Sequence, residues 1–291
     1  MTTWETAGCR LQQAREVAAY YKWLHRWVRY TKIVRQYSGF DSHTVHRLLT
    51  DPVTGENGPF VVHELMLEGL VLPPEPRVLD AGCGYGGTAF DLYPKIRGHW
   101  LGITLSRVQK ARAASEAMRR GFGHRIHFRI ASYDEPLTQR FDLAIAIESL
   151  VHSVSPAATV ANLAAALLPG GYFVMVDDMP VEQFPAALAD DLAGAKKFWR
   201  CPVMPTERGW KMAFDAAGLE IVRSVDLSKL IYHRPLSEIN ALIARDLKRR
   251  HWLRWTGMRR IPEANIGGSL LERLALAGAM QYRLLVGRKR A

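Results

Sequence analysis

Four glycines within six residues give this chain its strongest chemical signal. Gly82, Gly84, Gly86 and Gly87 follow directly after the short apolar segment 78–81. Glycine is needed where the backbone takes a positive φ angle, or where a ligand must approach the backbone without meeting a Cβ atom. Backbone N–H groups in such a turn can hold the polar parts of a nucleotide at the start of the following helix. The run therefore predicts a cofactor-binding loop.

A nicotinamide dinucleotide is a poor fit to this loop. Gly82, Gly84 and Gly87 match G-x-G-x-x-G, but that pattern requires an acidic residue about 20 positions later to bind the ribose hydroxyls. The next predicted strand ends in Thr104-Leu105-Ser106-Arg107-Val108-Gln109, which contains no carboxylate. The sequence therefore favours a different nucleotide.

The motifs resemble, in order and spacing, those of the class I S-adenosylmethionine-dependent methyltransferases. Residues 80–86 have the form D/E-x-G-x-G-x-G of that family's first motif. Segments 102–109, 141–148 and 167–173 resemble later motifs of its sterol, tocopherol and cyclopropane-lipid branch, and together the matches cover about residues 76 to 180. The resemblance implies an α/β, Rossmann-like fold with a seven-stranded, mostly parallel sheet and helices on both faces. It also implies S-adenosyl-L-methionine as the cofactor.

Cofactor contacts are implied by the same resemblance at the ends of the first three core strands. They are Asp80, Gly82, Cys83, Gly84, Thr104, Leu105, Gln109, Ser132 and Tyr133. The glycine turn would receive the amino-acid part of the donor, and the Gln109 amide offers both a donor and an acceptor to ribose hydroxyls. Many relatives have an acid at the position of Ser132, but here the acid, Asp134, comes two residues late. Ser132 and the Tyr133 backbone are therefore expected to recognise adenine.

Two candidate catalytic residues follow the strand predicted over 141–147. Glu148-Ser149-Leu150-Val151-His152 resembles the Glu-x-x-x-His of sterol and prenyl C-methyltransferases. In those enzymes an alkene attacks the methyl group, and a carboxylate can stabilise the resulting cation or take its proton. We expect Glu148 to serve this role, with His152 as the alternative base or as its orienting partner. An ordinary buried histidine remains the competing interpretation of His152.

Aromatic residues on both sides of the core are candidates for the substrate pocket. Segment 11–36 lacks proline and glycine and has apolar residues every three or four positions, which predicts a helix. In the resembled branch such helices wall the pocket, so Tyr20 and Tyr21 are candidate substrate contacts. Phe198, Trp199 and Tyr232 are candidates beyond the core. The same helix, with its broad aromatic face and basic residues, could instead lie on a membrane surface or be exchanged within a homo-oligomer.

The alternation of predicted elements sets the domain boundaries. Helices are predicted over 60–70, 86–94, 106–121 and 156–168, and strands over 77–81, 99–104, 125–131, 141–147, 171–177, 219–224 and 281–287. This pattern predicts a parallel sheet with ligands at the strands' C-terminal ends. We expect a helical cap over 1–72, a core over 73–232 plus 280–291, and substrate lid segments over 180–215 and 233–279.

Charge is concentrated in the two flanks of the chain. Residues 229–291 contain 14 Lys and Arg against 4 Asp and Glu, and residues 1–50 contain 8 against 3, whereas the remainder has 17 against 21. Basic flanks could bind nucleic acid, anionic lipid or a phosphorylated small substrate. The densest basic cluster lies within 245–260. Its arginines could bind the phosphates of a prenyl diphosphate, although a solvated surface is an equal alternative.

Other global features exclude several classes of protein. We expect no transmembrane span. Residues 1–5 lack the order of a signal peptide, so we expect a cytoplasmic protein. Cys9, Cys83 and Cys201 are odd in number and widely spaced, giving neither a disulfide framework nor a metal site.

The sequence therefore predicts a methyltransferase acting on a small terpenoid, prenyl or lipid-like molecule, with methylation at an alkene carbon favoured. O- or N-methylation of an aromatic or glycosylated natural product is the chief alternative. An RNA methyltransferase is disfavoured because an Asn-Pro-Pro-Tyr type motif is absent from the sequence. A membrane- or partner-binding protein that retains the fold without activity is the remaining alternative.

Overall fold

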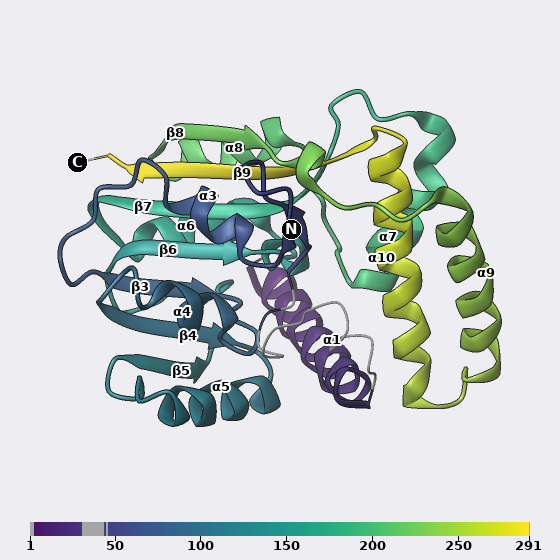
Figure 1. Ribbon diagram of the computed structural model, residues 1–291, viewed down its shortest axis with the longest axis horizontal. Coiled ribbons are helices and arrows are strands. Elements are labelled where there is room, and N and C mark those ends of the chain that lie inside the picture. The colour runs from purple at the N-terminus through teal and green to yellow at the C-terminus, as the bar shows by residue number, and fades with distance from the viewer. Residues whose placement is uncertain (1–2, 31–43, 45, 291) are drawn as a thin grey trace.

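The computed structural model describes residues 3–30, 44 and 46–290, and a seven-stranded sheet forms its centre (Figure 1). The strands are β3 (Arg77–Ala81), β4 (His99–Thr104), β5 (Ile126–Ile130), β6 (Phe141–Ile147), β7 (Leu167–Pro180), β8 (Leu219–Asp226) and β9 (Met280–Lys289). Their spatial order is β5-β4-β3-β6-β7-β9-β8, with β9 antiparallel to both of its neighbours and β3 to β7 parallel. The expected seven-stranded, mostly parallel sheet is confirmed.

Helices cover both faces of this sheet because its central strands are apolar on both sides. One face packs against α3 (Val61–Leu67), α4 (Gly87–Leu92) and α5 (Arg107–Arg119), and the other packs against α6 (Pro156–Ala165) and α8 (Glu207–Ala216). In β6, Leu143 and Ile145 face the first layer, whereas Ala144 and Ala146 face the second. Near-continuous burial along a strand is what two covered faces require.

A second helical unit stands beside the sheet (Figure 1). It consists of α7 (Ala189–Trp199), α9 (Leu236–Trp252) and α10 (Arg260–Leu276), with the short helices η2 (Ala186–Leu188) and η4 (Gly257–Arg259). Ile239, Ile266 and Leu274 belong to an apolar cluster that this unit holds separately from the two sheet layers. Helices α9 and α10 lie between β8 and β9 in sequence, so the insertion expected over 233–279 is present.

The N-terminal part begins with α1 (Thr3–Tyr30), which contacts α10. The helix predicted over 11–36 thus continues toward the N-terminus, while its last six residues lie outside the described part of the chain. The short strands β1 (Leu49–Thr50) and β2 (Asn57–Gly58) follow as a hairpin. Two single-turn helices, η1 (Leu150–His152) and η3 (Ser228–Leu230), complete the fold.

Two of the expected segment boundaries are wrong. Helix α8 falls in the expected lid 180–215, yet fully buried Trp210 and Phe214 anchor it to the sheet. These two side chains are four residues apart and share one face of the helix, which makes α8 a core helix rather than a lid. Helix α3 falls in the expected cap 1–72, but Val62 and Met66 likewise pack it into the sheet layer.

Candidate active site

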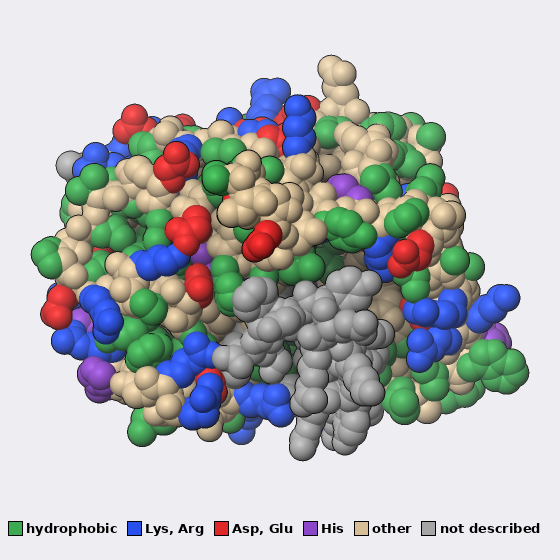
Figure 2. Space-filling view, in the orientation of Figure 1, with side chains coloured by type: hydrophobic (Ala, Val, Ile, Leu, Met, Phe, Trp, Pro, Cys, Tyr) green, Lys and Arg blue, Asp and Glu red, His purple; other side chains and the backbone are tan. Residues whose placement is uncertain are grey.

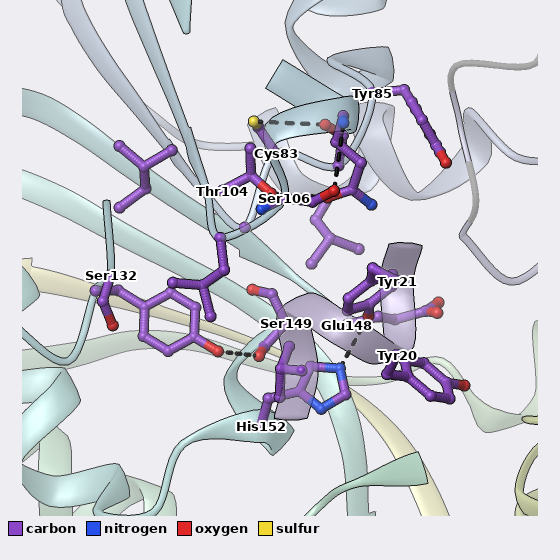
Figure 3. Close-up of a pocket in the computed structure, with 18 of the residues that line it drawn as sticks. Tyr20, Tyr21, Cys83, Tyr85, Thr104, Ser106, Ser132, Glu148, Ser149 and His152 are labelled. Atoms are coloured by element: carbon purple, nitrogen blue, oxygen red, sulfur yellow. Dashed lines mark hydrogen bonds between the residues drawn. The ribbon is translucent and has the colours of Figure 1, made fainter. Parts of the chain in front are cut away.

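A cavity opens at the C-terminal ends of β3, β4, β5 and β6, with α1 lying across it (Figure 3). Its empty space amounts to about 1240 Å³ when the open mouth is included. The lining residues are Val17, Tyr20, Tyr21, Leu24, His46, Gly82, Cys83, Gly84, Tyr85, Ile103, Thr104, Leu105, Ser106, Gln109, Ala131, Ser132, Tyr133, Ile147, Glu148, Ser149, His152 and Trp199. The strand-end location predicted from the sequence is therefore where the cavity lies.

The glycine turn forms one wall of this cavity. Gly82 has φ +93°, and a Cβ atom there would lie 2.4 Å from the Cβ of Ser149. Gly84 has φ +52°, and a Cβ atom there would meet no atom within 4 Å, because the position faces open space. Gly82 thus permits close packing against the end of β6, whereas Gly84 leaves the backbone accessible to a ligand.

Hydrogen bonds lock the ends of the strands around this turn. The Ser149 hydroxyl donates to the Ala81 carbonyl at 2.7 Å, which ties the end of β6 to the end of β3. The Tyr133 hydroxyl donates to the Ser149 carbonyl at 2.6 Å, which adds the loop after β5. The predicted adenine-side residue Tyr133 therefore shapes the cavity wall with its ring while its hydroxyl is engaged in the protein.

Thr104 and Gln109 form a polar pair at the end of β4. The Thr104 hydroxyl donates to Gln109 Oε1 at 2.7 Å, and Ser106 caps α5 by accepting from the Gln109 backbone N–H. Since Oε1 is engaged, the Gln109 amide NH₂ group is the part that can donate to a ligand. This arrangement suits a ribose hydroxyl, as the resemblance implies.

Asp80 lies buried behind the glycine turn and does not line the cavity itself. Burial raises the pKa of its carboxyl to about 7, and its Oδ2 atom has no hydrogen-bond partner among the described residues. An unpartnered buried carboxylate oxygen is costly unless something satisfies it. The ammonium group of S-adenosyl-L-methionine has the complementary charge, so the site's chemistry fits this cofactor, with Asp80, Gly82 and Gly84 on its amino-acid side.

Asp134, which follows β5 two residues later than the acid of many relatives, has a structural role. Asp134 Oδ1 accepts hydrogen bonds from the hydroxyls of Ser153, at 2.9 Å, and Thr159. Its backbone N–H donates to Ser132 Oγ at 3.1 Å. Asp134 therefore holds the start of α6, and the cavity wall at this point consists of Ala131, Ser132 and Tyr133, as the spacing predicted.

Glu148 lies at the end of β6 with a left-handed backbone, φ +48°. Its Oε1 atom accepts two hydrogen bonds of 2.8 Å, from the Arg47 backbone N–H and from the Tyr282 hydroxyl. Burial raises the pKa of Glu148, while Arg47 and the two hydrogen bonds act in the opposite direction. A non-glycine residue in this region is uncommon and requires support from its surroundings. Here two distant segments supply that support.

Arg47 also pairs with Asp178, because its Nη2 atom lies 2.7 Å from Asp178 Oδ2. One residue therefore orients Glu148 through its backbone and neutralises a neighbouring carboxylate through its side chain. Sequence reasoning missed both Arg47 and Tyr282. Each lies about 100 or more positions from Glu148, and only the pairing of β7 with β9 brings Tyr282 to this end of the sheet.

His152 takes part in a second network at the cavity wall. Its Nδ1 atom lies 3.2 Å from the Arg200 carbonyl and its Nε2 atom lies 2.9 Å from the Tyr21 hydroxyl (Figure 3). A carbonyl can only accept, so Nδ1 carries the hydrogen and Nε2 accepts from Tyr21. Burial lowers the pKa of His152 to about 4, which keeps the ring neutral at pH 7. Gln13 donates to the carbonyls of both His152 and Arg200, at 3.0 and 2.8 Å, and fastens α1 over the site.

Three of the five predicted substrate residues reach the cavity. Tyr20, Tyr21 and Trp199 line it. Phe198 instead packs in the apolar cluster of α7, α9 and α10, with the Arg250 guanidinium 5.3 Å from its ring centroid. Tyr232 lies on the surface between η3 and α9, 53% exposed. The predictions that Phe198 and Tyr232 line the substrate pocket are therefore wrong. Aromatic composition does not show which face of an element turns toward the site.

The packing of the Trp199 ring against α10 was also not predicted from the sequence. The Trp199 indole N–H donates to the Ala264 carbonyl at 3.0 Å. A Cβ atom at Gly267 of α10 would lie 2.3 Å from Trp199 Cδ1, so only glycine leaves room for the ring. Among the other missed lining residues, Val17 and Leu24 belong to the helical apolar stripe, whereas His46 had no distinguishing signal in the sequence.

Comparisons with known proteins agree with this geometry. A family model described as a methyltransferase domain matches residues 74–229. The tocopherol O-methyltransferase of Arabidopsis thaliana is 36% identical over 102 residues, which are 34% of this chain and 29% of that protein. The O-methyltransferase cnsE of Penicillium expansum is 35% identical over 132 residues, which are 44% of this chain and 48% of that protein. The matched part thus spans less than half the length of either relative.

Structural similarity extends over nearly the whole chain. A geranyl diphosphate methyltransferase, solved in complex with GPP and sinefungin, aligns with a TM-score of 0.70. The alignment covers 96% of this chain and 99% of that one, at 18% identity. Because the family model covers more than half of the chain and the sheet order, glycine turn and cavity agree with it, this chain belongs to the methyltransferase domain family and has the class I S-adenosylmethionine-dependent methyltransferase fold.

Proposed function

We propose that this chain transfers the methyl group of S-adenosyl-L-methionine to an alkene carbon of a small terpenoid, prenyl or lipid-like molecule. The observation that carries this proposal is Glu148, a partly buried carboxylate that lines the cavity and is held in place from two directions. An immobilised carboxylate among aromatic rings suits an acceptor that becomes positively charged during the reaction. When bound, S-adenosyl-L-methionine supplies an electrophilic methyl group.

The residues around Glu148 fit that role chemically. When an alkene carbon bonds to a methyl group, positive charge develops on the neighbouring acceptor carbon, and a proton is then lost to a base. The rings of Tyr20, Tyr21 and Trp199 offer faces that attract positive charge. Both described hydrogen bonds to Glu148 end on Oε1, so Oε2 is the oxygen we assign to the acceptor. Fixed geometry of this kind supplies alignment, which is most of what methyl transfer needs.

Two of the similar proteins act on acceptors of this class. The aligned solved structure is that of a geranyl diphosphate methyltransferase, and a sterol 24-C-methyltransferase of Gibberella zeae is 31% identical over 104 residues. A phosphate site on Arg249 and Arg250 receives no support, because Arg249 pairs with Asp246, Arg250 pairs with Glu263, and neither arginine lines the cavity. Prenyl diphosphates remain within the proposed acceptor class, with the phosphate contacts on residues other than Arg249 and Arg250.

O-methylation is the second candidate, and the Tyr21–His152 pair favours it. A neutral imidazole that accepts from a tyrosine hydroxyl can receive a proton through that hydroxyl from an acceptor O–H group. The two relatives described above are named O-methyltransferases. On this alternative, His152 and Tyr21 carry the reaction and Glu148 serves to position the acceptor.

Product analysis separates the two candidates. Purified protein would be incubated with S-adenosyl-L-methionine carrying a ¹³C methyl group and with prenyl diphosphates, prenyl alcohols, sterols and prenylated phenols. We expect the labelled methyl carbon to resonate in the alkyl region of the ¹³C spectrum, as a C–CH₃ group. A labelled methoxy resonance would instead establish O-methylation and reject the carbon assignment.

Glu148→Gln supplies the matching test of the residue. This variant keeps the size of the side chain and an acceptor oxygen for Arg47 and Tyr282, but it removes the negative charge. We expect donor binding measured by calorimetry to stay within about twofold and turnover to fall by roughly 10²-fold or more, the range typical of a general base. Turnover equal to that of the unmodified chain would reject the role of Glu148.

A further inference from the structure

The outer end of the α9–α10 hairpin carries exposed apolar side chains in an ordered turn. We define residues 248–260 as the hairpin tip. Trp252 is 82% exposed, Trp255 is 87% exposed and Met258 is 47% exposed. The backbone holds them in place, since Leu253 N–H donates to the Arg249 carbonyl at 3.0 Å and Thr256 N–H donates to the Leu253 carbonyl at 2.9 Å. Two tryptophans three positions apart are therefore presented to solvent at the same end of the hairpin.

The same tip is strongly basic. Residues 248–260 contain six Lys and Arg and no Asp or Glu. Asp246 is buried and pairs with Arg245 and Arg249, at 2.9 and 3.3 Å. Buried Glu263 pairs with Arg250 at 3.0 Å, with Arg259 at 4.0 Å and with Arg200 at 2.7 Å. These ion pairs neutralise the arginines that contact Asp246 and Glu263, and the contacts to Glu263 connect α9 with α10.

The remaining basic residues at the tip point outward. Lys248 and Arg254 are exposed and Arg260 is half-exposed, and none of them has an acidic partner within the described residues. The Arg254 guanidinium lies 5.5 Å from the Trp255 ring centroid, so a positive charge and an indole are presented together. Figure 2 shows basic side chains and an apolar projection next to each other at the lower right edge, where Figure 1 places the end of this hairpin.

We propose that the hairpin tip docks on the surface of an anionic phospholipid bilayer. Tryptophan is favoured at the headgroup level, where its ring contacts acyl chains and its N–H stays in a polar layer. Clustered Lys and Arg next to such a ring add attraction to anionic headgroups. The tip combines both features on a projecting turn. Among the described residues no helix is long and apolar enough to cross a bilayer, so the contact would be peripheral.

Other occupants fit these observations less well. A second copy of the chain would bring two strongly basic tips together, which like-charge repulsion opposes. A single-stranded nucleic acid would use a groove that follows its backbone, whereas the tip projects from the molecule (Figure 2). Docking through α1 is also disfavoured, because Val17, Tyr20 and Tyr21 of that helix turn into the cavity.

Membrane docking would add a delivery route to the proposed function. An apolar acceptor dissolved in a bilayer could reach a cavity that α1 and Trp199 line at the protein surface. Delivery of the acceptor from the bilayer rests on the proposed function, whereas the docking of the tip does not. Vesicle binding is measured without methyl donor or acceptor, so a failure to bind lipid and a failure to methylate would be told apart.

The test compares vesicles of phosphatidylcholine alone with vesicles that also contain phosphatidylglycerol. We expect the full chain to sediment with the anionic vesicles, to bind neutral vesicles at least about tenfold more weakly, and to be released by added salt. Trp252→Ala with Trp255→Ala should reduce the partition coefficient by roughly tenfold or more. Lys248→Glu with Arg254→Glu should abolish the preference for anionic lipid.

Matched controls keep the result interpretable. Tyr232→Ala removes another exposed aromatic ring outside the tip, and Lys229→Glu with Arg208→Glu reverses two exposed charges elsewhere. Both controls should bind vesicles like the unmodified chain. Because Trp252 and Trp255 are exposed, the variants should retain the thermal unfolding midpoint, which verifies their folding.

Brominated lipids localise the contact. Bromine on the acyl chains quenches the fluorescence of tryptophans that enter the interface, and we expect quenching in the unmodified chain but not in the double tryptophan variant. Absence of binding to anionic vesicles, equal binding by the tip variants, or binding to single-stranded RNA in place of vesicles would each overturn the proposal.

Discussion

The Tyr282 hydroxyl of β9 donates a hydrogen bond of 2.8 Å to Glu148 Oε1 at the end of β6. These residues are 134 positions apart, and β7 lies between their two strands in the sheet. The antiparallel last strand therefore contributes directly to the candidate active site. Its hydroxyl stabilises the ionised form of this carboxyl, whose pKa burial raises.

Tyr282→Phe tests this relationship. Loss of the hydroxyl should raise the pKa of Glu148 further, because the hydrogen bond favours the carboxylate. If ionised Glu148 is required, the acid limb of the pH profile of kcat should move to higher pH. Tyr172→Phe, at another buried tyrosine of the sheet, should leave the profile unchanged. An unshifted acid limb in Tyr282→Phe would show that this hydrogen bond does not control the reacting group.

His152 should couple stability to pH. Its pKa is about 4 in the folded chain and about 6.5 when unfolded. Between these values the unfolded state binds more protons, so the contribution of His152 to stability is present above about pH 6.5 and is lost as pH falls toward about 4. Lowering the pH from about 7 to about 4.5 should cost about 2 kcal/mol through this residue.

The measurement is urea unfolding at both pH values. His152→Gln should lose about 2 kcal/mol less than the unmodified chain on acidification, since it lacks the titrating ring. His251→Gln, at an exposed histidine, should behave like the unmodified chain. Equal acid sensitivity in all three proteins would contradict the buried, neutral assignment of His152.

Asp80 should make donor binding proton-linked. Its carboxyl has a pKa of about 7 and an unpartnered Oδ2 atom, so a cationic ligand near the glycine turn would favour the ionised form. Binding of S-adenosyl-L-methionine should therefore release protons below about pH 7 and become tighter as pH rises through that value. Calorimetry in buffers of different ionisation enthalpy counts the released protons. Asp80→Asn should abolish the release, and an unchanged proton count in that variant would reject the assignment.

Gly267 and Gly268 offer a matched pair for the seat of Trp199. A Cβ atom at Gly267 would lie 2.3 Å from the Trp199 ring, whereas one at Gly268 would lie at an ordinary 3.4 Å. Gly267→Ala should therefore displace Trp199 and destabilise the chain by about 1–3 kcal/mol. Gly268→Ala should be neutral or slightly stabilising, because alanine favours the helix. Thermal unfolding measures the change in stability, and acceptor affinity reports the displacement of Trp199. Equal stability and equal affinity in the two variants would contradict this packing.

The amino-acid sequence by itself determined the parts of the fold that depend on local periodicity. Strands β3, β4 and β6 were placed to within one residue, because apolar runs bounded by glycine and proline leave few alternatives. The lining residues at the strand ends, such as Gly84, Gln109 and Glu148, followed as well. In a parallel sheet all these ends meet at one edge, so order along the chain translates directly into a site.

Only the tertiary structure decided which residues complete that site from a distance. Arg47 and Tyr282 converge on Glu148, Gln13 fastens α1 to the loop after β6, and Gly267 seats Trp199. It also decided that Phe198 and Tyr232 face away from the cavity, and that the basic insertion presents its tryptophans to solvent. Such contacts depend on how whole elements pack and turn, and residues tens to hundreds of positions apart leave no local pattern from which that packing could be predicted.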